Sequence, residues 1–315
     1  MPLLGNNRIH QIAFVVNDIE ATSEAFAKLL GIQKPTWFLT APHSISKAYF
    51  RGKPTNAQNK LVFIDTPSVQ IELIEPNDEP STMREFLERK EGIHHIAFDV
   101  DNMQQRVKIM EDQGFSVIQT GEFTSSKGRY VYLDTTKRYK TMIELLERDE
   151  PQGYAQPKPS LSPPLLGTDQ ITQLAIVVED MEQTADAFCT LLGIEKPPVI
   201  HANDPAITQV VYRGEQTDAK AKFMFIQTPL LEIELVEPAA DSPSIWNEHL
   251  DNEGEGIHHL AFVVKDLDEQ IDKLKKLGYP LIQRGNFWNR KGRYAYLDTR
   301  SDLKVIIELL EKDEQ

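Results

Sequence analysis

Cysteine is almost missing from this sequence, which contains one, Cys189, in 315 residues. A lone cysteine cannot close an intrachain disulfide, so the fold has to rest on a buried core. A cytoplasmic location is expected, because disulfide-poor chains are typical of reducing compartments. Cys189 lies in ADAFCTLLG, whose apolar residues recur at helical spacing. We therefore predict a buried, structural thiol.

Long apolar runs and an excess of basic residues are missing as well. No segment approaches the roughly 20 apolar residues that cross a bilayer, and the N-terminal MPLLGNNRIHQIAF lacks the basic and apolar regions of a secretory signal. The formal net charge of −14 disfavours a nucleic-acid surface, which needs clustered Lys and Arg. These absences predict no membrane partner and no nucleic-acid partner. A small-molecule substrate is expected. The chain is expected to be a monomer or a homodimer.

A duplication is the dominant feature that the sequence does contain. The string GIHHIAFDV at 92–100 returns as GIHHLAFVV at 256–264, and each copy is followed by GRY, YLDT and IELLE. The chain length suits two domains of roughly 150 residues, each with its own core. We predict a first domain at 1–150, a proline-rich linker at 151–169 and a second domain at 170–315.

Each half repeats a β-α-β-β-β pattern twice. The strands alternate apolar and polar residues, as in RIHQIAFVV, and the helices carry apolar residues at helical spacing, as in ATSEAFAKLLG. The second strands of the first and third modules are expected at SKAYFRG and TQVVYRG. The pattern predicts an α+β fold of four βαβββ modules, paired into two domains with open, trough-forming mixed sheets. The modules span about 8–77, 92–148, 170–238 and 256–312.

Alternation along the strands decides which side chains reach the trough. In RIHQIAFVV, Gln11 and Ala13 share the face opposite the apolar Ile12, so Gln11 is directed to the open face of the sheet. The same reasoning directs His95 to the open face and His94 away from it. At most one of the two histidines is therefore expected to belong to a site.

Four polar residues of each half satisfy this rule, and they recur as a set in both halves. Two carboxylates, a neutral imidazole and an amide oxygen make an oxygen-rich, nearly neutral site that suits Zn, Co, Ni, Mn or Fe. We predict a divalent metal, up to two ions per chain. The expected ligands are Gln11, Glu72, His95 and Glu144 in the first half, and Gln173, Glu234, His259 and Glu308 in the second.

The pairing of the modules stays open at this point. The short connections within each half favour the first module with the second and the third with the fourth. The long linker would also allow the first module to pair with the fourth, and the second with the third. The same ligand residues result from either arrangement.

At these residues the chain resembles the vicinal oxygen chelate superfamily, which includes glyoxalase I, methylmalonyl-CoA epimerase, extradiol dioxygenases and bleomycin or fosfomycin resistance proteins. The resemblance covers nearly all four modules and implies two glyoxalase-like domains, with metal positions on the eight residues above. GIHHIAF followed by IELLE is most similar to the epimerase, whereas the ligand set is similar to glyoxalase I of the eukaryotic type. The second glutamate base of the epimerase is matched by Lys47 and Gln209, and neither is a carboxylate.

The resemblance implies a metal-dependent epimerase or isomerase that acts through a metal-stabilised enediolate. Its substrate would be a small oxygen-bearing molecule, such as an acyl-CoA, a 2-oxo compound or a hydroxy carbonyl. A glyoxalase I-type lyase, similar to lactoylglutathione lyase, is one alternative. A non-catalytic ligand-binding or resistance protein of the same fold is another. The expected catalytic carboxylates are Glu144, Glu308, Glu72 and Glu234.

Two further observations concern the substrate. Arg129 and Arg293, in the repeated KGRY, are candidates for holding a substrate carboxylate or phosphate. The halves have diverged elsewhere, since Thr124 corresponds to Trp288. The two sites are therefore expected either to accept different substrates or to include one that has lost activity.

Overall fold

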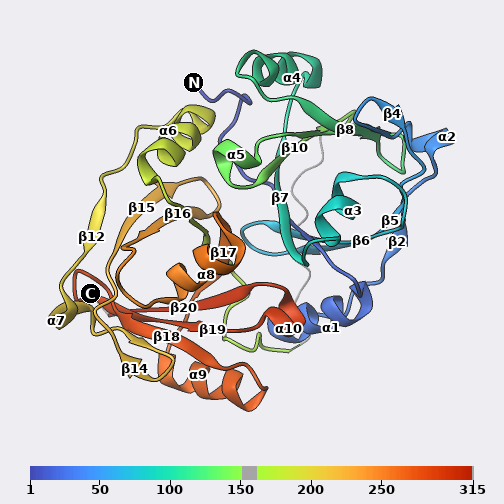
Figure 1. Ribbon diagram of the computed structural model, residues 1–315. Coiled ribbons are helices and arrows are strands. Elements are labelled where there is room, and N and C mark those ends of the chain that lie inside the picture. The colour runs from blue at the N-terminus through green and yellow to red at the C-terminus, as the bar shows by residue number, and fades with distance from the viewer. Residues whose placement is uncertain (151–161, 314–315) are drawn as a thin grey trace.

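Two curled ten-stranded sheets form the architecture in the computed structural model, which describes residues 1–150 and 162–313 (Figure 1). Each sheet contains the strands of two consecutive modules, so the predicted α+β fold of four modules paired into two domains is confirmed. The pairing joins the first module with the second and the third with the fourth. In Figure 1 the first domain, blue to green, lies beside the second, yellow to red.

The elements of the two domains correspond one to one. In the first domain they are β1 (Gln11–Val15), α1 (Ile19–Leu30), β2 (Phe38–Leu39), α2 (His43–Ser46), β3 (Tyr49–Phe50), β4 (Lys53–Pro54), β5 (Asn59–Asp65), β6 (Gln70–Pro76), α3 (Thr82–Leu87), β7 (Gly92–Asp99), α4 (Met103–Asp112), β8 (Val117–Glu122), β9 (Gly128–Leu133), α5 (Thr136–Tyr139) and β10 (Met142–Arg148). In the second they are β11 (Gln173–Val177), α6 (Met181–Leu192), β12 (Ile200–Ala202), α7 (Pro205–Thr208), β13 (Val211–Tyr212), β14 (Glu215–Gln216), β15 (Ala221–Gln227), β16 (Glu232–Pro238), α8 (Ile245–Glu253), β17 (Gly256–Val263), α9 (Leu267–Lys276), β18 (Leu281–Asn286), β19 (Gly292–Leu297), α10 (Arg300–Leu303) and β20 (Ile306–Lys312).

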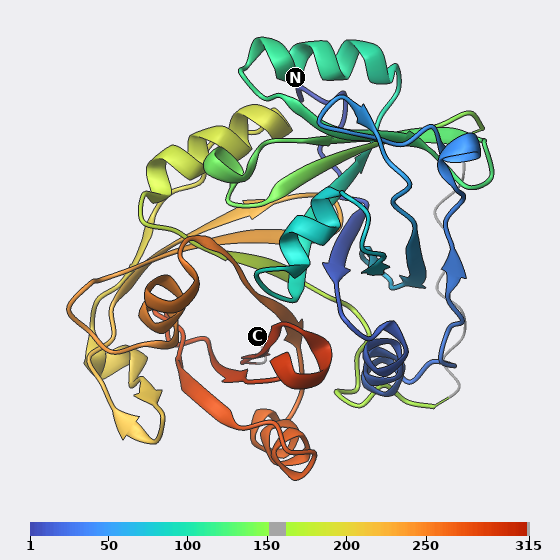
Figure 2. The same cartoon turned by 45° about the vertical axis from the view of Figure 1, so that its right-hand side comes forward.

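The strand order within each sheet brings the first strands of two modules together. The first sheet runs β2-β5-β6-β1-β7-β10-β9-β8-β3-β4, and the second repeats it as β12-β15-β16-β11-β17-β20-β19-β18-β13-β14. The central pairs β1–β7 and β11–β17 are antiparallel, whereas each outer neighbour, such as β6 beside β1, is parallel. The short helices α3 and α8 lie within the curves of the two sheets (Figure 2).

The two faces of the central strands divide as the alternation predicts. Ile12 and Phe14 lie in the core on the helix side of the sheet, while Ala13 and Val15 belong to a separate cluster on the concave side. The helix that covers this sheet begins at an Asp18 cap, whose side chain accepts a hydrogen bond from the Ala21 amide. Small residues on the concave face leave room above the sheet for a cavity.

The predicted second strand of the first and third modules is present, but it is only two residues long and pairs with the neighbouring module. SKAYFRG covers the end of α2, the strand β3 and the turn that leads to β4, and β3 pairs with β8 of the neighbouring module. The strand that pairs within the module is β2, which is only Phe38–Leu39 long. The chain between β2 and β3 therefore joins the two far ends of the curled sheet, a long-range arrangement that local alternation cannot reveal. TQVVYRG in the second domain does the same.

The domains pack on one another through reciprocal contacts. Helix α1 contacts α10, and α5 contacts α6, as Figure 1 also shows. The ring of Tyr139 lies 5.2 Å from that of Phe188 between the latter two helices. The amide of Leu3 donates to the carbonyl of Leu191, 2.9 Å away. One continuous apolar core therefore runs through both domains, and Cys189 is buried in it, as predicted.

The predicted linker is described only in part. Residues 151–161 lie outside the described residues. From Ser162 onward the chain runs along α1, where the Leu165 amide donates to the Leu29 carbonyl and Leu166 is buried. Among the helices of the described ranges, none is long and apolar enough to cross a bilayer.

Candidate metal sites

The register of the central strands gathers the four predicted ligands of each half. In the first sheet, Ala13 lies opposite Glu72 on one side and His95 on the other. Two residues away, Ala97 lies between Gln11 and Glu144 in the same manner. The methyl groups of the two alanines leave space over the sheet, into which the four longer side chains reach. This is the physical reason why small residues separate the polar ones.

Three ligand candidates of the first half form a tight, buried group. The Nε2 atom of His95 is 3.1 Å from Oε2 of Glu144 and 3.6 Å from Oε2 of Glu72. All three side chains are buried, and their ligating atoms lie within 4.8 Å of one another. The predicted set is thus brought together from three strands.

The second half builds the same group with similar distances. The Nε2 atom of His259 is 3.1 Å from Oε2 of Glu234 and 3.0 Å from Oε2 of Glu308. Ala175 and Ala261 take the places of the two alanines. The duplication therefore repeats a geometry as well as a sequence.

The glutamines lie beside these groups with their amide nitrogens already engaged. The Nε2 of Gln11 donates to Oε1 of Gln70 at 2.5 Å, and the Nε2 of Gln173 donates to Glu232. Because the nitrogen is held, the amide oxygen of each glutamine remains as the ligand atom. The Oε1 of Gln173 is buried and has no hydrogen-bond partner among the described residues.

Burial and mutual charge control the protonation of these groups. Burial lowers the pKa of His95, but the nearby Glu144 and Glu72 outweigh it and raise the pKa to about 9. His259 behaves alike, with Glu308 and Glu234 raising its pKa to about 9. A bound cation would replace that proton between the two carboxylates.

The histidine that precedes each ligand also belongs to the site, contrary to the prediction. A β-bulge between Ala13 and Phe14 interrupts the alternation of β7, so His94 is not carried to the opposite face. The Nδ1 atoms of His94 and His95 are 2.8 Å apart. Alternation failed here because a bulge is a property of the strand pair rather than of one strand. The pair of consecutive histidines, which recurs in both halves, was the feature of the sequence that could have indicated a role for His94.

The unsatisfied atoms fit a metal ion. His95 Nε2 and Glu144 Oε2 are buried without a well-formed hydrogen bond among the residues described, as are the corresponding atoms of His259 and Glu308. Unsatisfied buried polar atoms are costly, and a divalent ion would compensate several of them at once. Two carboxylates, an imidazole and an amide oxygen are suitable donors for Zn, Mn, Fe, Co or Ni.

The structure places the other predicted residues away from the metal positions. Arg129 is exposed and paired with Glu147, and Arg293 is paired with Asp268 and Glu311. Neither is among the residues that line the cavities over the ligand groups. The two arginines that were expected to hold a substrate anion therefore lie in surface ion pairs.

Lys47 and Gln209 do not reach the cavities either. Each adopts a left-handed conformation at the end of a short helix, and Lys47 is exposed, with its Nζ bonded to the Ser44 carbonyl. The residues that line the cavities at this place are Ser46 and Thr208. A carboxylate is missing from this position in both described cavities, as the sequence indicates.

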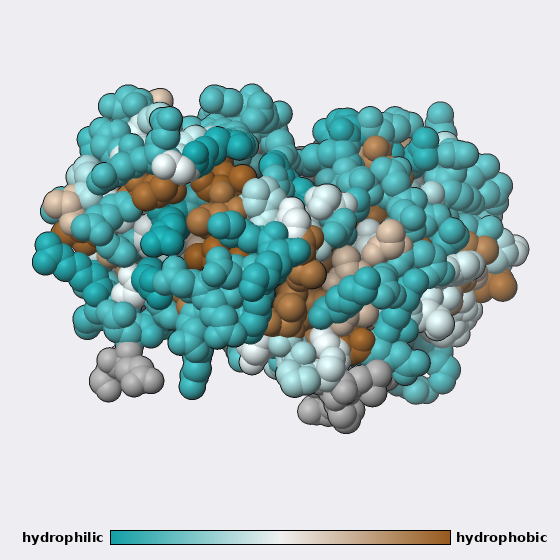
Figure 3. Space-filling view, turned by 90° about the horizontal axis from the view of Figure 1, so that it is seen from below, coloured by the Kyte–Doolittle hydropathy of each residue, from teal (hydrophilic) through white to brown (hydrophobic). Residues whose placement is uncertain are grey.

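Each ligand group opens into a cavity, and the two cavities differ. The first has a volume of about 740 Å³ and the second about 860 Å³. Arg148 lines the first cavity, where its Nε is 3.2 Å from Asp99. The corresponding residues of the second cavity are Lys312 and the apolar Val263. From below, the molecule is largely hydrophilic, with hydrophobic side chains recessed in the lobe that bears the C-terminal end and between the lobes (Figure 3).

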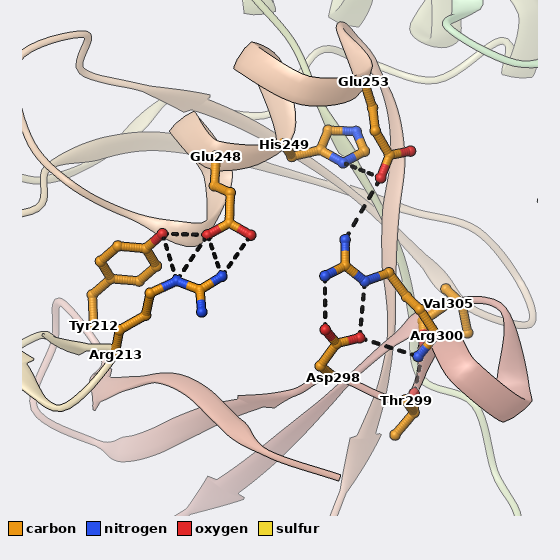
Figure 4. A network of polar contacts seen from close by, with 9 residues as sticks. All are labelled: Tyr212, Arg213, Glu248, His249, Glu253, Asp298, Thr299, Arg300 and Val305. Carbon is orange, nitrogen blue, oxygen red and sulfur yellow. Dashed lines mark hydrogen bonds and ion pairs between the residues drawn. The ribbon is translucent and has the colours of Figure 1, made fainter. Parts of the chain in front are cut away.

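Polar contacts support the helix behind the second ligand group. Glu248 on α8 accepts hydrogen bonds from Arg213, with 2.7 Å between its Oε2 and the guanidinium Nη2, and from Tyr212 (Figure 4). On the same helix, His249 Nδ1 lies 3.9 Å from Glu253. The imidazole of His249 in turn contacts that of His258, with 5.1 Å between the ring centroids.

Comparison with known proteins agrees with this architecture. A family model described as the Glyoxalase/Bleomycin resistance protein/Dioxygenase superfamily matches residues 10–133 and 172–296. The fold and the repeated ligand groups thus define a protein of two glyoxalase-like domains. The chain belongs to the glyoxalase/bleomycin resistance protein/dioxygenase superfamily, which confirms the resemblance found in the sequence.

Individual relatives cover parts of the chain. The uncharacterized protein YqjC of Bacillus subtilis is 33% identical over 96 residues, which is 30% of this chain and 67% of that protein. The ethylmalonyl-CoA/methylmalonyl-CoA epimerase of Cereibacter sphaeroides is 28% identical over 117 residues, which is 36% of this chain and 77% of the epimerase.

Solved structures match over the whole chain but at low identity. A mutant of 4-hydroxymandelate synthase from Streptomyces coelicolor has a TM-score of 0.59 at 11% identity, covering 98% of this chain and 94% of that one. BphC, a halotolerant catechol dioxygenase, has a TM-score of 0.51 at 11% identity, covering 98% and 87%. These likenesses concern the fold alone.

Proposed function

We propose that the protein is a metal-dependent epimerase or isomerase with two sites, each of which moves a proton at a carbon next to a carbonyl. The observation that carries this proposal is the placement of two buried carboxylates on either side of one imidazole. The strand order β6-β1-β7-β10 sets Glu72 and Glu144 apart by two strands, and both reach toward His95. The relation to an epimerase over 36% of the chain supports the same class.

The carboxylates supply the chemistry that this reaction requires. A divalent ion held by the Gln, His and Glu side chains would polarise the substrate carbonyl and stabilise the negative charge that forms when a proton leaves the adjacent carbon. Glu144 takes the proton as a general base, and Glu308 does so in the second site. Glu72 and Glu234 lie on the other side of the histidine imidazole in their respective sites. A proton removed by one carboxylate and returned by the other would invert the carbon.

Burial favours the protonated form of these carboxyl groups before a metal ion binds. In the metal-free site it raises the pKa of Glu72, and that of Glu234 to about 7. The cavities are also lined by Asp99 and Glu122 in the first domain and by Glu232 and Asp313 in the second. Because neither Lys47 nor Gln209 is a carboxylate, and Glu72 and Glu234 lie next to the histidine of each group, we assign the second base to the ligand set itself.

A glyoxalase I-type lyase is the second candidate, because the ligand set Gln, Glu, His and Glu is the feature on which that resemblance rests. Both candidates use the same proton abstraction. They differ in where the proton returns: to the same carbon in the epimerase, and to its neighbour in the lyase.

The test combines metal content with isotope exchange. The purified protein is loaded with Zn²⁺, Co²⁺ or Mn²⁺, and we expect two ions per chain, falling to one in Glu144→Gln or Glu308→Gln. Incubation in D₂O with methylmalonyl-CoA is expected to incorporate deuterium at the acidic carbon. Consumption of the methylglyoxal–glutathione hemithioacetal would instead support the lyase.

The controls separate chemistry from binding. The double variant Glu144→Gln with Glu308→Gln is expected to lose exchange on either substrate. A protein that takes up no divalent ion would contradict the proposal. A protein that binds two ions and both substrates but exchanges no proton would indicate a ligand-binding protein of the same fold.

A further inference from the structure

The two cavities share their ligand groups but differ in their walls, and the difference is concentrated in aromatic rings. Two of the three tryptophans of the chain, Trp246 and Trp288, line the second cavity. Their counterparts in the first cavity are Met83 and Thr124. The remaining tryptophan, Trp37, lies on the surface of the first domain.

Trp246 forms part of the wall of the second cavity. It lies on α8, is 2% exposed, and contacts Phe223 edge to face, with 5.5 Å between the ring centroids. It also contacts Tyr296, the neighbour of Glu308 in the sheet, with 6.0 Å between centroids. A rigid aromatic surface therefore extends to the metal ligands.

A second aromatic surface continues this wall. Trp288 stacks on Phe225 with 5.6 Å between centroids and 23° between ring planes. Phe225 is in turn nearly parallel to Phe223, at 6.3 Å and 4°. In the first cavity the residue that corresponds to Phe223 is Leu61, and Phe63, the counterpart of Phe225, contacts Phe38 at a tilt of 41° in place of a parallel stack.

One polar atom in this aromatic wall has no described partner. The indole Nε1 of Trp246 is buried and makes no hydrogen bond to the described residues. A buried indole N–H usually finds an acceptor. Met83, its counterpart, has no such donor. The wall of the second cavity thus contains aromatic faces together with one buried, unsatisfied hydrogen-bond donor.

The first cavity carries an ion pair at a place where the second keeps only a cation, Lys312. Asp99 lies 3.1 Å from His10 and 3.2 Å from Arg148, whose guanidinium also stacks over Phe123 at 5.4 Å. The second cavity has Val263 in place of Asp99.

We infer that the second site takes a substrate with a planar, unsaturated ring next to its metal-binding oxygens, and that the first site takes an aliphatic substrate. The inference rests on the proposed function, because a substrate ring is positioned beside these walls only if the substrate oxygens bind the metal ion of that site. Flat rings stack on Trp and Phe faces, and this favours them over saturated rings of equal size. The duplicated sites have therefore been divided between two substrate classes.

Two hydroxamates that share one metal-binding head test this division. Benzohydroxamate and cyclohexanecarbohydroxamate present the same pair of oxygens and rings of similar size, and they differ in ring planarity. Glu144→Gln isolates the second site and Glu308→Gln isolates the first. With both full-length variants loaded with Zn²⁺, isothermal titration gives the ratio of the two dissociation constants at each site. We expect benzohydroxamate to bind about tenfold more tightly than the cyclohexyl compound at the second site, and the ratio at the first site to stay below about threefold.

The wall residues are then exchanged for those of the first site. Trp288→Thr, made in the Glu144→Gln protein, is expected to lower the preference for benzohydroxamate to about threefold or less. Binding of the cyclohexyl compound should change little. Trp246→Met should act in the same direction, and Trp37→Phe is the matched control away from the cavity. Since Trp288 is only half-buried, its substitution leaves a folded protein even if the Trp246 variant does not fold.

An independent measurement reports the same contact. Benzohydroxamate is expected to quench the tryptophan fluorescence of the Glu144→Gln protein more strongly than that of Glu308→Gln, because two of the three tryptophans lie at the second cavity. Equal affinity ratios at the two sites would overturn the inference while leaving the proposed function intact. Failure of both variants to take up Zn²⁺ would overturn the proposed function itself.

Discussion

His94 and His95 contact each other through their Nδ1 atoms, which are 2.8 Å apart, and the Nε2 of His94 lies 3.1 Å from the hydroxyl of Thr82. Burial lowers the pKa of His94 far below its ordinary value, so this ring is neutral. If Nε2 of His95 binds a metal, its Nδ1 carries the proton and donates to Nδ1 of His94. That ring then donates from Nε2 to Thr82, and the threonine hydroxyl donates to the sulfur of Met142. His94 therefore fixes the tautomer and orientation of the ligand.

Replacement of His94 by phenylalanine should weaken metal binding at the first site. The phenyl ring keeps most of the volume but removes the acceptor for the Nδ1 proton of His95. Loss of such a supporting hydrogen bond typically lowers metal affinity about 10- to 100-fold. The measurement is competition for Zn²⁺ against a chromophoric chelator in the Glu308→Gln protein. Thr82→Val should have a smaller effect, and an unchanged affinity in His94→Phe would show that His94 does not support the ligand.

The eight metal-ligand candidates could be predicted because their positions follow from local alternation. Gln11, Glu72 and Glu144 alternate with large apolar residues, and the helix side of each strand is uniformly apolar. Because the chain is duplicated, the same alternation of polar and apolar residues recurs in the second half and supports the assignment again. A period of two is sufficient to assign a face, provided that the strand is regular.

Features that depend on partners in space could not be predicted in the same way. The bulge that brings His94 to the site arises from the pairing of β1 with β7, and β3 finds its partner in another module. Trp246 sits on a short helix whose position over the trough is set by the curvature of the whole sheet. Arg148 lies four residues after Glu144 on the same face of β10 and lines the cavity, whereas Arg129, the arginine that the sequence indicates, is paired with Glu147 at the surface.

Removal of metal should lower thermal stability through both sites. Each ligand group brings two carboxylates into a buried space, and an ion bound only by the folded state stabilises it by about 2.7 kcal/mol when its free concentration is 100 times the dissociation constant. Addition of EDTA is expected to lower the Tm of the wild type in a calorimetric scan. Glu144→Gln should retain part of this response. The double variant with Glu308→Gln should show none, and a persisting response there would point to a different binding site.

Two ion pairs across the domain boundary should contribute to stability equally. Lys140 lies 2.7 Å from Glu255, and Lys304 lies 3.2 Å from Glu91, which occupies the equivalent place in the other domain. Glu255 also accepts a hydrogen bond from the Glu179 amide at 3.0 Å. Because these groups are partly buried, Glu255→Gln is expected to lower the free energy of unfolding by about 1 kcal/mol in urea titrations.

A double-mutant cycle isolates the contribution of the pair. Lys140→Met combined with Glu255→Gln should cost less than the sum of the single changes. Glu24→Gln breaks the exposed pair with Lys28 within α1 and should change the free energy of unfolding by less than about 0.5 kcal/mol. Additive effects of the two substitutions at the domain boundary would show that the contact does not stabilise the packing of the domains.

His249 should make the stability of the second domain sensitive to acid. Burial lowers its pKa from 6.5 to about 4; Glu253 opposes this shift, while Lys90 and Arg300 add to it. The unfolded chain takes up a proton near pH 6.5 and the folded protein only near pH 4. The stabilisation is therefore complete above pH 6.5 and is lost as the pH falls toward 4.

The first domain supplies the matched substitution, since Phe86 occupies the position of His249 and contacts His94 as His249 contacts His258. Between pH 7 and pH 5 the wild type should lose about 2 kcal/mol more of its free energy of unfolding than His249→Phe, as measured by urea titration at each pH. EDTA in all samples removes the contribution of bound metal. Phe86→His should introduce the same sensitivity into the first domain. Parallel pH profiles for the wild type and His249→Phe would mean that His249 is accessible to protons in the folded protein.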